Sequence, residues 1–164
     1  FKLVHGGLSQ FYFNCKRVTL DPEGQYLIGN LVFAAIRDVP ANAIGGLTLG
    51  ADPISISTAI AAGKKGVAIS PPIVRKEPKK HGTQKWIEGD AGRVKNVVVI
   101  DDVITTGGST VTAIERLRES GLTVVRAAVI IDREEGGREG IEKTGVEVIS
   151  LFKRSDFDAR RLGK

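Results

Sequence analysis

The sequence predicts an α/β protein whose mostly parallel central sheet is flanked by helices. Short apolar runs of strand length alternate along the chain with segments of helical periodicity, which is typical of a parallel sheet with right-handed crossovers. Residues 97–100 are wholly apolar, as expected of a central strand covered on both faces. Glycine is plentiful, at 20 of 164 residues, and aromatic residues make up only 5%, which favours turns and phosphate loops over an aromatic-rich sandwich.

The first elements are predicted from alternation, turn chemistry and helical spacing. Residues 11–20 alternate and are partly aromatic or β-branched, so they predict a strand. Residues 21–24, Asp-Pro-Glu-Gly, are typical of a turn. Apolar residues then recur at helical spacing over residues 25–39, and Pro40 ends the helix that they predict.

The following elements continue the alternation of strands and helices. Residues 44–49 predict a strand, and residues 67–74 predict the next one. Between them, Asp52 can cap a helix that has Pro53 at its first position and extends to about Ala62.

A long charged loop is expected over residues 75–93, and a loop of this length inside a compact domain is usually functional or disordered. Beyond it, Gly121 ends a helix predicted at residues 109–120. The remaining strands are predicted at residues 97–100, 124–131 and 146–151.

The composition indicates one domain, over residues 1–164. No apolar run approaches the roughly 18 residues that a membrane span needs, so no membrane partner is expected. The single cysteine, Cys15, excludes an internal disulfide and suits a reducing cytoplasm, and its apolar surroundings favour a small buried residue over a nucleophile. The chain begins at Phe1 and contains no Met, so N-terminal residues of the natural chain are expected to be missing.

The formal net charge is +5, and basic residues gather in residues 75–89. Few aromatic residues lie near them for stacking on bases, so this segment favours a small polyanion such as pyrophosphate over nucleic acid. A charge run by itself is usually a solvated loop, and that alternative stays open on composition alone. His5 and His81 are the two histidines, and their spacing predicts no zinc site.

The most informative segment is residues 97–110, Val-Val-Val-Ile-Asp-Asp-Val-Ile-Thr-Thr-Gly-Gly-Ser-Thr. In a parallel sheet this loop lies at the carboxyl end of a strand, where open α/β folds bind ligands. Backbone amides and hydroxyls at a helix N-terminus suit a phosphate monoester, and Gly107 and Gly108 let the backbone approach it closely. Asp101 and Asp102 would repel a phosphate, but they can accept hydrogen bonds from vicinal sugar hydroxyls and favour a developing oxocarbenium ion.

An Asp-Asp pair alone is as typical of a capped polar turn, but the buried strand before it and the Thr-Thr-Gly-Gly-Ser-Thr run after it favour the functional interpretation. Two common nucleotide motifs are excluded. Residues 45–50 have the glycine spacing of a P-loop, but Ala51 and Asp52 follow where Lys and Ser or Thr are required. No strand is followed by a dinucleotide-type GxGxxG.

Residues 97–110 resemble, along their whole length, the phosphoribosyl pyrophosphate signature of type I phosphoribosyltransferases. The resemblance extends from Phe1 to about Phe157 and implies the fold of that family, with a small hood subdomain built from the chain ends. The signature implies that the two acids contact the ribose hydroxyls and that Thr105 to Ser109 cradle the 5′-phosphate, but it leaves the base unspecified. The signature residues implied to bind phosphoribosyl pyrophosphate are Asp101, Asp102, Val103, Ile104, Thr105, Thr106, Gly107, Gly108 and Ser109.

The basic residues 75–82 narrow the choice of base. Cations in a closing lid can stabilise a leaving pyrophosphate and exclude water, and a histidine can donate a hydrogen bond or a proton to it. The order Arg-Lys-x-x-Lys-x-His-Gly is similar to the catalytic loop of orotate phosphoribosyltransferases. This resemblance implies a homodimer in which the loop around Lys76–His81 reaches the neighbouring site. The implied pyrophosphate contacts are Arg75, Lys76, Lys79 and His81, and the implied catalytic residues are Lys79, His81, Asp101 and Asp102.

Two further segments bear on the base. Residues 11–24 resemble the N-terminal strand and turn of this family, which implies that Tyr12 or Phe13 stacks on the orotate ring, with ordinary core packing as the alternative for each. Arg133, which follows a predicted strand, is implied to pair with the orotate carboxylate, a task suited to guanidinium. By the same resemblance, Thr105 is implied to contact orotate.

The resemblance implies transfer of phosphoribose from phosphoribosyl pyrophosphate to orotate, giving orotidine monophosphate and pyrophosphate in de novo pyrimidine biosynthesis. Mg²⁺ is the implied cofactor, held mainly by substrate with no direct protein ligand. The sequence departs from the family at Val4 and Ile54, near which members often carry lysine, and Lys2 or Lys64 are the candidates to replace them. The rival hypotheses are a phosphoribosyltransferase for another base and a regulator that senses phosphoribosyl pyrophosphate and binds nucleic acid.

Overall fold

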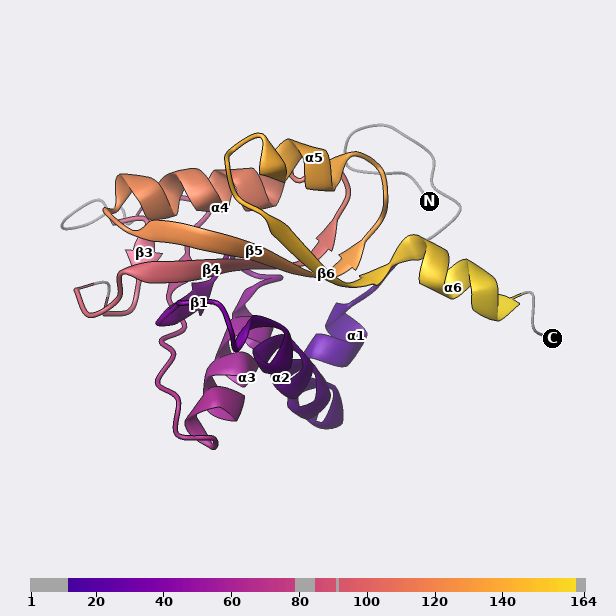
Figure 1. The fold of residues 1–164 in the computed structure, drawn as a ribbon, viewed down its shortest axis with the longest axis horizontal. Helices are drawn as coiled ribbons and strands as arrows, with labels where there is room; N and C mark the ends of the chain where they lie inside the picture. Colours follow the sequence, from indigo (N-terminus) through magenta and orange to yellow (C-terminus); the bar gives the residue numbers. More distant parts are fainter. Residues whose placement is uncertain (1–11, 79–84, 91, 162–164) are drawn as a thin grey trace.

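The computed structural model describes residues 12–78, 85–90 and 92–161 and has an α/β architecture (Figure 1). Its main sheet has the order β1-β4-β5-β6, and all three pairings are parallel. This confirms the predicted parallel sheet. Its strands are β1 (Ala43–Gly45), β4 (Asn96–Ile104), β5 (Thr123–Asp132) and β6 (Val148–Lys153).

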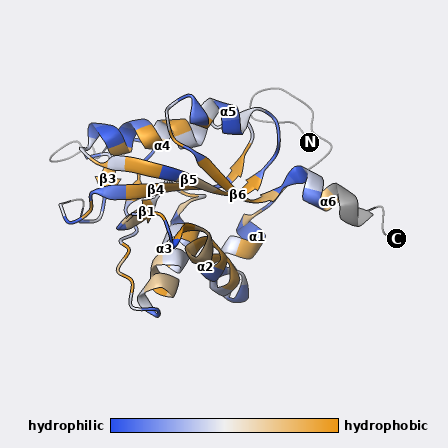
Figure 2. Ribbon diagram, viewed as in Figure 1, coloured by the Kyte–Doolittle hydropathy of each residue, from blue (hydrophilic) through white to orange (hydrophobic). Residues whose placement is uncertain are grey.

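Helices cover both faces of this sheet. On one face lie α4 (Gly108–Glu119) and α5 (Gly137–Glu142), and on the other α2 (Pro22–Ile36) and α3 (Asp52–Gly63) (Figure 1). Hydrophobic and hydrophilic residues alternate along α4, as expected of a helix with one buried side (Figure 2). The helix predicted after residue 51 is confirmed, although Ala51 holds the cap position and Asp52 is the first helical residue.

The apolar run of β4 divides the core into two layers. Val97 and Val99 pack in the cluster beneath α4, whereas Val98 and Ile100 pack in the cluster with α2 and α3. Alternate side chains of a strand point to opposite faces, and all four are at most 1% exposed. Burial of each such side chain contributes about 1.5–3 kcal/mol, which is why no polar residue interrupts this run.

The strand order creates a switch point beside β1. An isolated bridge joins Ala43 to Ser70, which extends the sheet at the other edge of β1. The chain therefore adds its next segment on one side of β1 and then crosses to β4 on the opposite side. The crevice between the carboxyl ends of β1 and β4 is where open α/β sheets bind ligands.

Two predicted strands are shorter than expected. The strand predicted at residues 44–49 ends at Gly45, and of residues 67–74 only β2 (Ile73–Val74) is a strand. Pro71 and Pro72 cannot donate to a ladder, so continuous pairing stops before β2. β2 pairs antiparallel with β3 (Ile87–Glu88), a strand inside the segment that was expected to be loop alone.

The strand predicted at residues 11–20 is wrong over its described part. α1 (Lys16–Thr19) forms there instead, with the Thr19 N–H donating to the Cys15 carbonyl at 2.8 Å. Among the described residues no strand pairs with this segment, and local backbone hydrogen bonds prevail over the alternating pattern. Asp21 then caps α2 by accepting from the Gly24 N–H at 3.0 Å.

The described parts of the two chain ends meet beside the sheet. The Phe13 ring lies 5.3 Å from the ring of Phe157 in α6 (Arg154–Arg161), measured between centroids. Among the helices that the structure describes, none is long and apolar enough to span a membrane.

Candidate active site

Asp101 and Asp102 lie at the carboxyl end of β4 and are fixed by hydrogen bonds. The Asp101 side chain accepts from the Thr110 hydroxyl at 2.9 Å and from the Asp102 N–H at 3.0 Å. The Asp102 side chain accepts from the Val103 N–H at 2.9 Å. Because Thr110 belongs to α4, the helix that follows the loop helps to hold the acid that precedes it.

The two acids differ in environment. Asp101 is only 7% exposed, and burial, followed by the negative charge of Asp102, raises the pKa of Asp101 to about 7 despite the hydrogen bond from Thr110. Burial beside Asp102 therefore favours the protonated form of Asp101 more than that form is favoured in an exposed aspartate. A ligand that brings hydroxyl donors or positive charge to this pair would favour the carboxylate.

Residues 105–107 form the turn from β4 into α4, the phosphate turn. Gly107 occupies the cap position of α4 with a φ of 81°, which residues with a side chain rarely adopt. Thr106, Gly108 and Ser109 are exposed on this turn. Hydroxyls and backbone at the start of a twelve-residue helix make an arrangement that can bind a phosphate.

Asp101 and Asp102 form an acid pair, and the loop after β1 packs against this acid pair from the other side of the switch point. A Cβ on Gly50 would lie 2.9 Å from the Asp102 Oδ1, so glycine is needed for this approach. Nearby, the Thr48 hydroxyl donates to the Asp52 Oδ2 at 2.6 Å. Burial raises the pKa of Asp52 above its ordinary value in spite of this bond.

α1 brings to the site a cation that sequence reasoning missed. The Lys16 Nζ lies 3.4 Å from the Asp102 Oδ2, with side chains 49% and 16% exposed. No motif spacing indicates this contact, because the two residues are 86 positions apart. Cys15 is partly buried beside them, and burial, followed by the charge of Asp102, raises the pKa of its thiol to about 12. A thiol with a raised pKa is a poor nucleophile, and Cys15 packs against the apolar cluster beneath α2 and α3.

Arg133 follows β5 directly beside the phosphate turn. Its N–H donates to the Ile104 carbonyl at 3.1 Å, so Arg133 and Thr105 leave the sheet together. The Arg133 side chain is 6% exposed, and its Nη2 lies 2.8 Å from the Glu135 Oε1. Arg133 and Thr105, two of the residues implied to contact orotate, therefore lie at the same sheet edge as Asp101.

The two aromatic candidates differ in exposure. Tyr12 is 65% exposed, whereas Phe13 is half-buried and packs on Phe157. The packing of Phe13 agrees with the core-packing alternative for that residue, and Tyr12 has the ring surface that a flat ligand could cover.

The described ends of the basic loop contact the C-terminal half of α4. Arg75 forms an ion pair with Glu88 at 2.9 Å, and its carbonyl accepts a hydrogen bond from Arg116. The Arg116 guanidinium also stacks 4.1 Å from the centroid of the Trp86 ring. Arg116 is about 12 Å along α4 from the start of the helix at Gly108, so this contact of Arg75 is made away from the phosphate turn.

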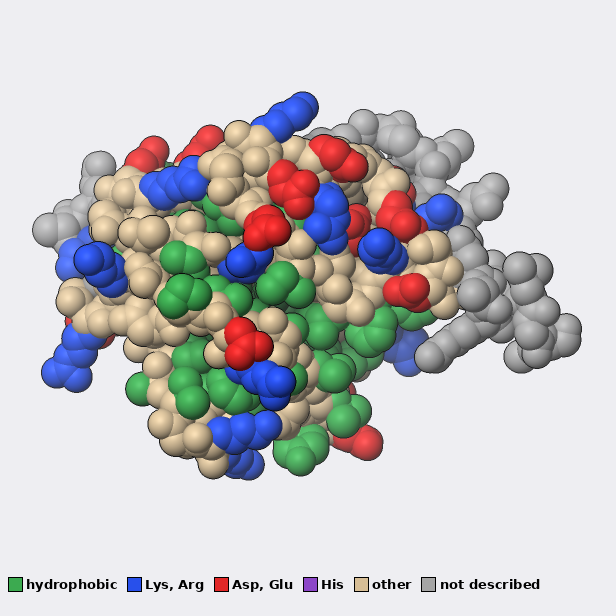
Figure 3. Space-filling model, in the orientation of Figure 1, with side chains coloured by type: hydrophobic (Ala, Val, Ile, Leu, Met, Phe, Trp, Pro, Cys, Tyr) green, Lys and Arg blue, Asp and Glu red, His purple; other side chains and the backbone are tan. Residues whose placement is uncertain are grey.

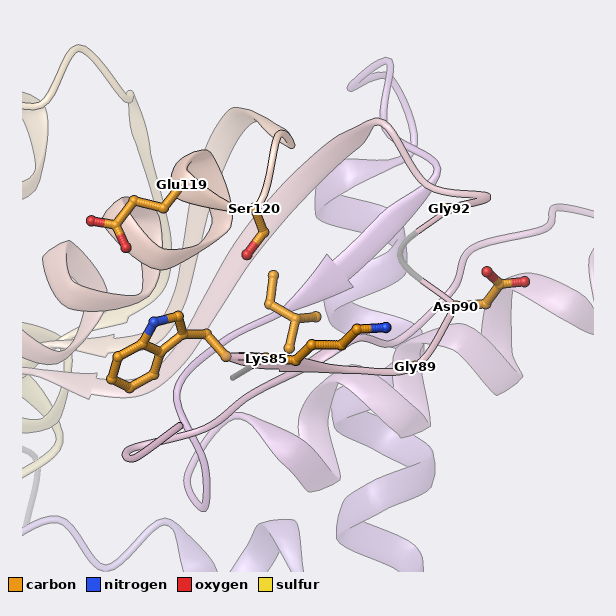
Figure 4. A pocket seen from close by; sticks show the side chains of 8 residues that line it. Lys85, Gly89, Asp90, Gly92, Glu119 and Ser120 are labelled. Atoms are coloured by element: carbon orange, nitrogen blue, oxygen red, sulfur yellow. The ribbon is translucent and has the colours of Figure 1, made fainter. Parts of the chain in front are cut away.

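A pocket of about 420 Å³ lies at that far end of α4 (Figure 4). It is separate from the acid pair, because the phosphate turn is at the opposite end of the helix. Of the other predicted loop contacts, Lys76 is exposed, and Lys79 and His81 lie outside the described residues. The residues lining the pocket are Lys85, Trp86, Ile87, Gly89, Asp90, Gly92, Glu119 and Ser120.

The two departures from the family pattern have different outcomes. Ile54 is fully buried in α3, and Lys64 caps the far end of that helix, so neither supplies a cation at the acid pair. Val4 and Lys2 lie outside the described residues. Over the described part of the chain, no three or more His, Cys, Asp or Glu side chains gather to hold a metal ion.

Comparison with known proteins identifies the family. Residues 68–155 match the family model described as a phosphoribosyl transferase domain. The chain is 47% identical to the orotate phosphoribosyltransferase of Aquifex aeolicus over 96% of this chain and 86% of that one. It is 44% identical to that of Leptospira biflexa, with the same coverage of both chains. The chain belongs to the orotate phosphoribosyltransferase family.

The fold of solved family members agrees. The Mycobacterium tuberculosis orotate phosphoribosyltransferase bound to Fe(III) dicitrate superposes with a TM-score of 0.83, at 34% identity, over 95% of this chain and 87% of that one. The complex of that enzyme with 5-phospho-alpha-D-ribosyl 1-diphosphate gives a TM-score of 0.76 at 34% identity, over 88% of this chain and 82% of that one. The type I phosphoribosyltransferase fold expected from the sequence is confirmed.

Proposed function

We propose that the acid pair and the phosphate turn form the site at which this orotate phosphoribosyltransferase family member joins orotate to phosphoribosyl pyrophosphate. The products are orotidine 5′-monophosphate and pyrophosphate, in pyrimidine biosynthesis. The observation that carries this assignment is the buried Asp101 with Asp102 at the switch point, followed by a glycine-capped turn into α4. The M. tuberculosis relative bound to 5-phospho-alpha-D-ribosyl 1-diphosphate supports the choice of donor.

The turn and the two acids bind different parts of phosphoribosyl pyrophosphate. Residues 105–109 bind the 5′-phosphate through backbone N–H groups and hydroxyls at the start of α4. Asp101 and Asp102 accept from the ribose hydroxyls, and Val103 and Ile104 complete the strand end that holds them. As the bond to pyrophosphate breaks, the negative charge of the pair stabilises the oxocarbenium-like sugar.

The orotate subsite lies between the ends of β4 and β5. Arg133 offers a buried guanidinium to the orotate carboxylate, and Thr105 offers a hydroxyl beside it. Tyr12 covers the ring of the base, with Phe13 as the alternative. The reaction needs no covalent nucleophile, because positioning and charge stabilisation carry it.

Magnesium fits this site as a substrate-held ion. The acid pair supplies the oxygen donors that Mg²⁺ prefers, but Thr110 and backbone N–H groups already occupy several of those oxygens. The ion would therefore be held mainly by pyrophosphate and ribose oxygens. When bound, it neutralises the charge of the leaving pyrophosphate.

The family member acts as a cytoplasmic homodimer in this proposal. Exposed apolar side chains gather on α2 and α3, and Figure 3 shows hydrophobic side chains over these helices. This face suits a second copy. In such a dimer, the loop carrying Lys76, Lys79 and His81 serves the neighbouring site, and the contact of Arg75 with Arg116 in the C-terminal half of α4 supports this arrangement. The exposed apolar residues of this face are Tyr26, Leu27, Leu31, Ile56 and Ile60.

The test is orotate consumption, followed by its ultraviolet absorbance, with phosphoribosyl pyrophosphate and Mg²⁺. Wild-type protein is expected to turn over orotate only with the metal, and Lys79→Ala and Asp101→Asn are each expected to lose about 100-fold or more of kcat. Lys143→Ala, an exposed change at the end of α5, is the control that keeps full activity. No turnover by wild-type protein that binds phosphoribosyl pyrophosphate would contradict the assignment of orotate as acceptor.

A further inference from the structure

α5 lies directly against the phosphate turn, and glycines make the contact possible. A Cβ on Gly137 would lie 2.7 Å from the Thr105 carbonyl oxygen, and a Cβ on Gly140 would lie 2.9 Å from the Thr106 carbonyl oxygen. From the opposite side, a Cβ on Gly107 would lie 2.6 Å from the Gly137 carbonyl oxygen. Ordinary contact begins at 3.4 Å, so a methyl group at either α5 position must displace the turn by roughly half an ångström.

One arginine anchors α5 to the sheet beneath it. The Arg138 guanidinium donates to the Val148 carbonyl at 2.7 Å and to the Ser150 hydroxyl at 2.5 Å, both on β6. Its Nε lies 3.4 Å from the Asp132 Oδ2 at the end of β5. The Asp132 Oδ1 accepts from the Glu134 N–H at 2.8 Å. A planar fork reaches these partners on two strands at once, which a lysine cannot do.

We propose that α5 is a positioning element for the 5′-phosphate. Gly137 and Gly140 fix the position of residues 105–107 relative to α5, because they lie against the carbonyls of Thr105 and Thr106. Arg138 holds α5 against β6 by hydrogen bonds. These three residues act through the turn, not by touching the substrate. The inference rests on the proposed function, because it requires the turn to bind the 5′-phosphate of phosphoribosyl pyrophosphate.

The ligands of the proposed reaction separate this role from a general loss of structure. Phosphoribosyl pyrophosphate and orotidine monophosphate both carry the 5′-phosphate, whereas pyrophosphate lacks it. Displacement of the turn should therefore weaken the binding of phosphoribosyl pyrophosphate and orotidine monophosphate and leave the binding of pyrophosphate unchanged. Misplacement of a binding group by a fraction of an ångström to 1 Å is expected to cost about tenfold or more in affinity.

The experiment measures the Kd of each ligand with Mg²⁺ by calorimetry, for wild-type protein, Gly140→Ala and the matched control Gly63→Ala. Gly63 ends α3, and a Cβ there meets nothing within 4 Å, so the control should bind all three ligands as wild type does. Alanine favours a helix over glycine by about 1 kcal/mol, which counts in favour of α5 folding in the variant. Gly140→Ala is expected to raise the Kd of phosphoribosyl pyrophosphate and of orotidine monophosphate about tenfold or more and to leave the Kd of pyrophosphate unchanged.

Binding of phosphoribosyl pyrophosphate by Gly140→Ala within threefold of wild type, or equal weakening of pyrophosphate, overturns the inference and leaves the proposed function standing. Wild-type protein that binds no phosphoribosyl pyrophosphate defeats the proposed function itself. If Gly140→Ala does not fold, Arg138→Lys is judged by the same three affinities, because it keeps the charge and loses the fork.

Discussion

Asp101→Asn is expected to make the protein more stable at alkaline pH while it removes activity. The substitution keeps the volume of a side chain that is 7% exposed. The asparagine Oδ1 can accept from the Asp102 N–H, and its Nδ2 can donate to the Thr110 hydroxyl, so both hydrogen bonds of the aspartate are replaced. What disappears is the cost of holding a second negative charge beside Asp102 in a buried place.

The magnitude follows from the pKa of Asp101, which rises from 3.8 to about 7 on folding, mainly through burial. Because the folded pKa is raised, the folded chain holds the proton more tightly, and this contribution to stability is present below pH 3.8 and is lost as pH rises through 7. At about 1.4 kcal/mol per pKa unit the whole loss is about 4 kcal/mol, of which about 3 kcal/mol falls between pH 5 and pH 8.5. The variant escapes this loss.

The assay is urea denaturation of wild-type and Asp101→Asn protein without ligand at pH 5 and pH 8.5. The advantage of the variant in unfolding free energy is expected to grow by about 3 kcal/mol between the two pH values. Asp38→Asn is the control, because Asp38 has a side chain 93% exposed and the exchange removes no buried charge. An advantage of Asp101→Asn that stays constant with pH would refute the reasoning.

Three further predictions concern Gly107 in the phosphate turn, Arg133 at the orotate subsite and Lys16 in α1. Gly107→Ala is expected to destabilise the protein by about 1–3 kcal/mol in thermal denaturation, because the position has a φ of 81° and the new Cβ would meet the Gly137 carbonyl; an unchanged melting temperature would contradict this. Arg133→Lys is expected to raise KM for orotate about 10-fold or more in steady-state kinetics, with KM for phosphoribosyl pyrophosphate nearly unchanged, since lysine loses the bidentate geometry; equal changes in both would argue against a carboxylate contact. Lys16→Gln is expected to change the unfolding free energy by less than about 1 kcal/mol in urea, because the Lys16 side chain of the ion pair with Asp102 is about half exposed; a larger loss would show that α1 depends on this pair.

The sheet and the turn could be predicted because residues that are adjacent in the sequence indicate them. The apolar residues 97–100 require cover on both faces, and the structure provides it. Asp101, Asp102 and Gly107 come after the apolar residues 97–100 along the same strand and its following turn, so their place towards the carboxyl end of β4 follows from chain order alone. Arg133 directly follows the neighbouring strand β5, but chain order alone gives it no role, and its role at the base was implied only by the family resemblance.

What the sequence did not reveal depends on contacts between distant segments. Lys16 meets Asp102 across 86 positions, and its segment was predicted as a strand because alternation carries no information on whether a partner strand exists. α5 is short and glycine-rich, so its composition indicates a loop, whereas Gly137 is there to let the helix touch the turn. The hairpin of β2 and β3 has two residues in each strand, which is too short for any periodicity to indicate.

The most direct test of the central claim is a comparison of bases as acceptors for phosphoribosyl pyrophosphate. The wild-type protein is assayed with Mg²⁺ and orotate, uracil, adenine or hypoxanthine, and kcat/KM is determined for each. With Arg133 buried beside the phosphate turn, orotate, the acceptor that carries a carboxylate, is expected to exceed each of the others by about 100-fold or more. A purine used as well as orotate, or uracil used equally well, would contradict the claim that this site is built for orotate.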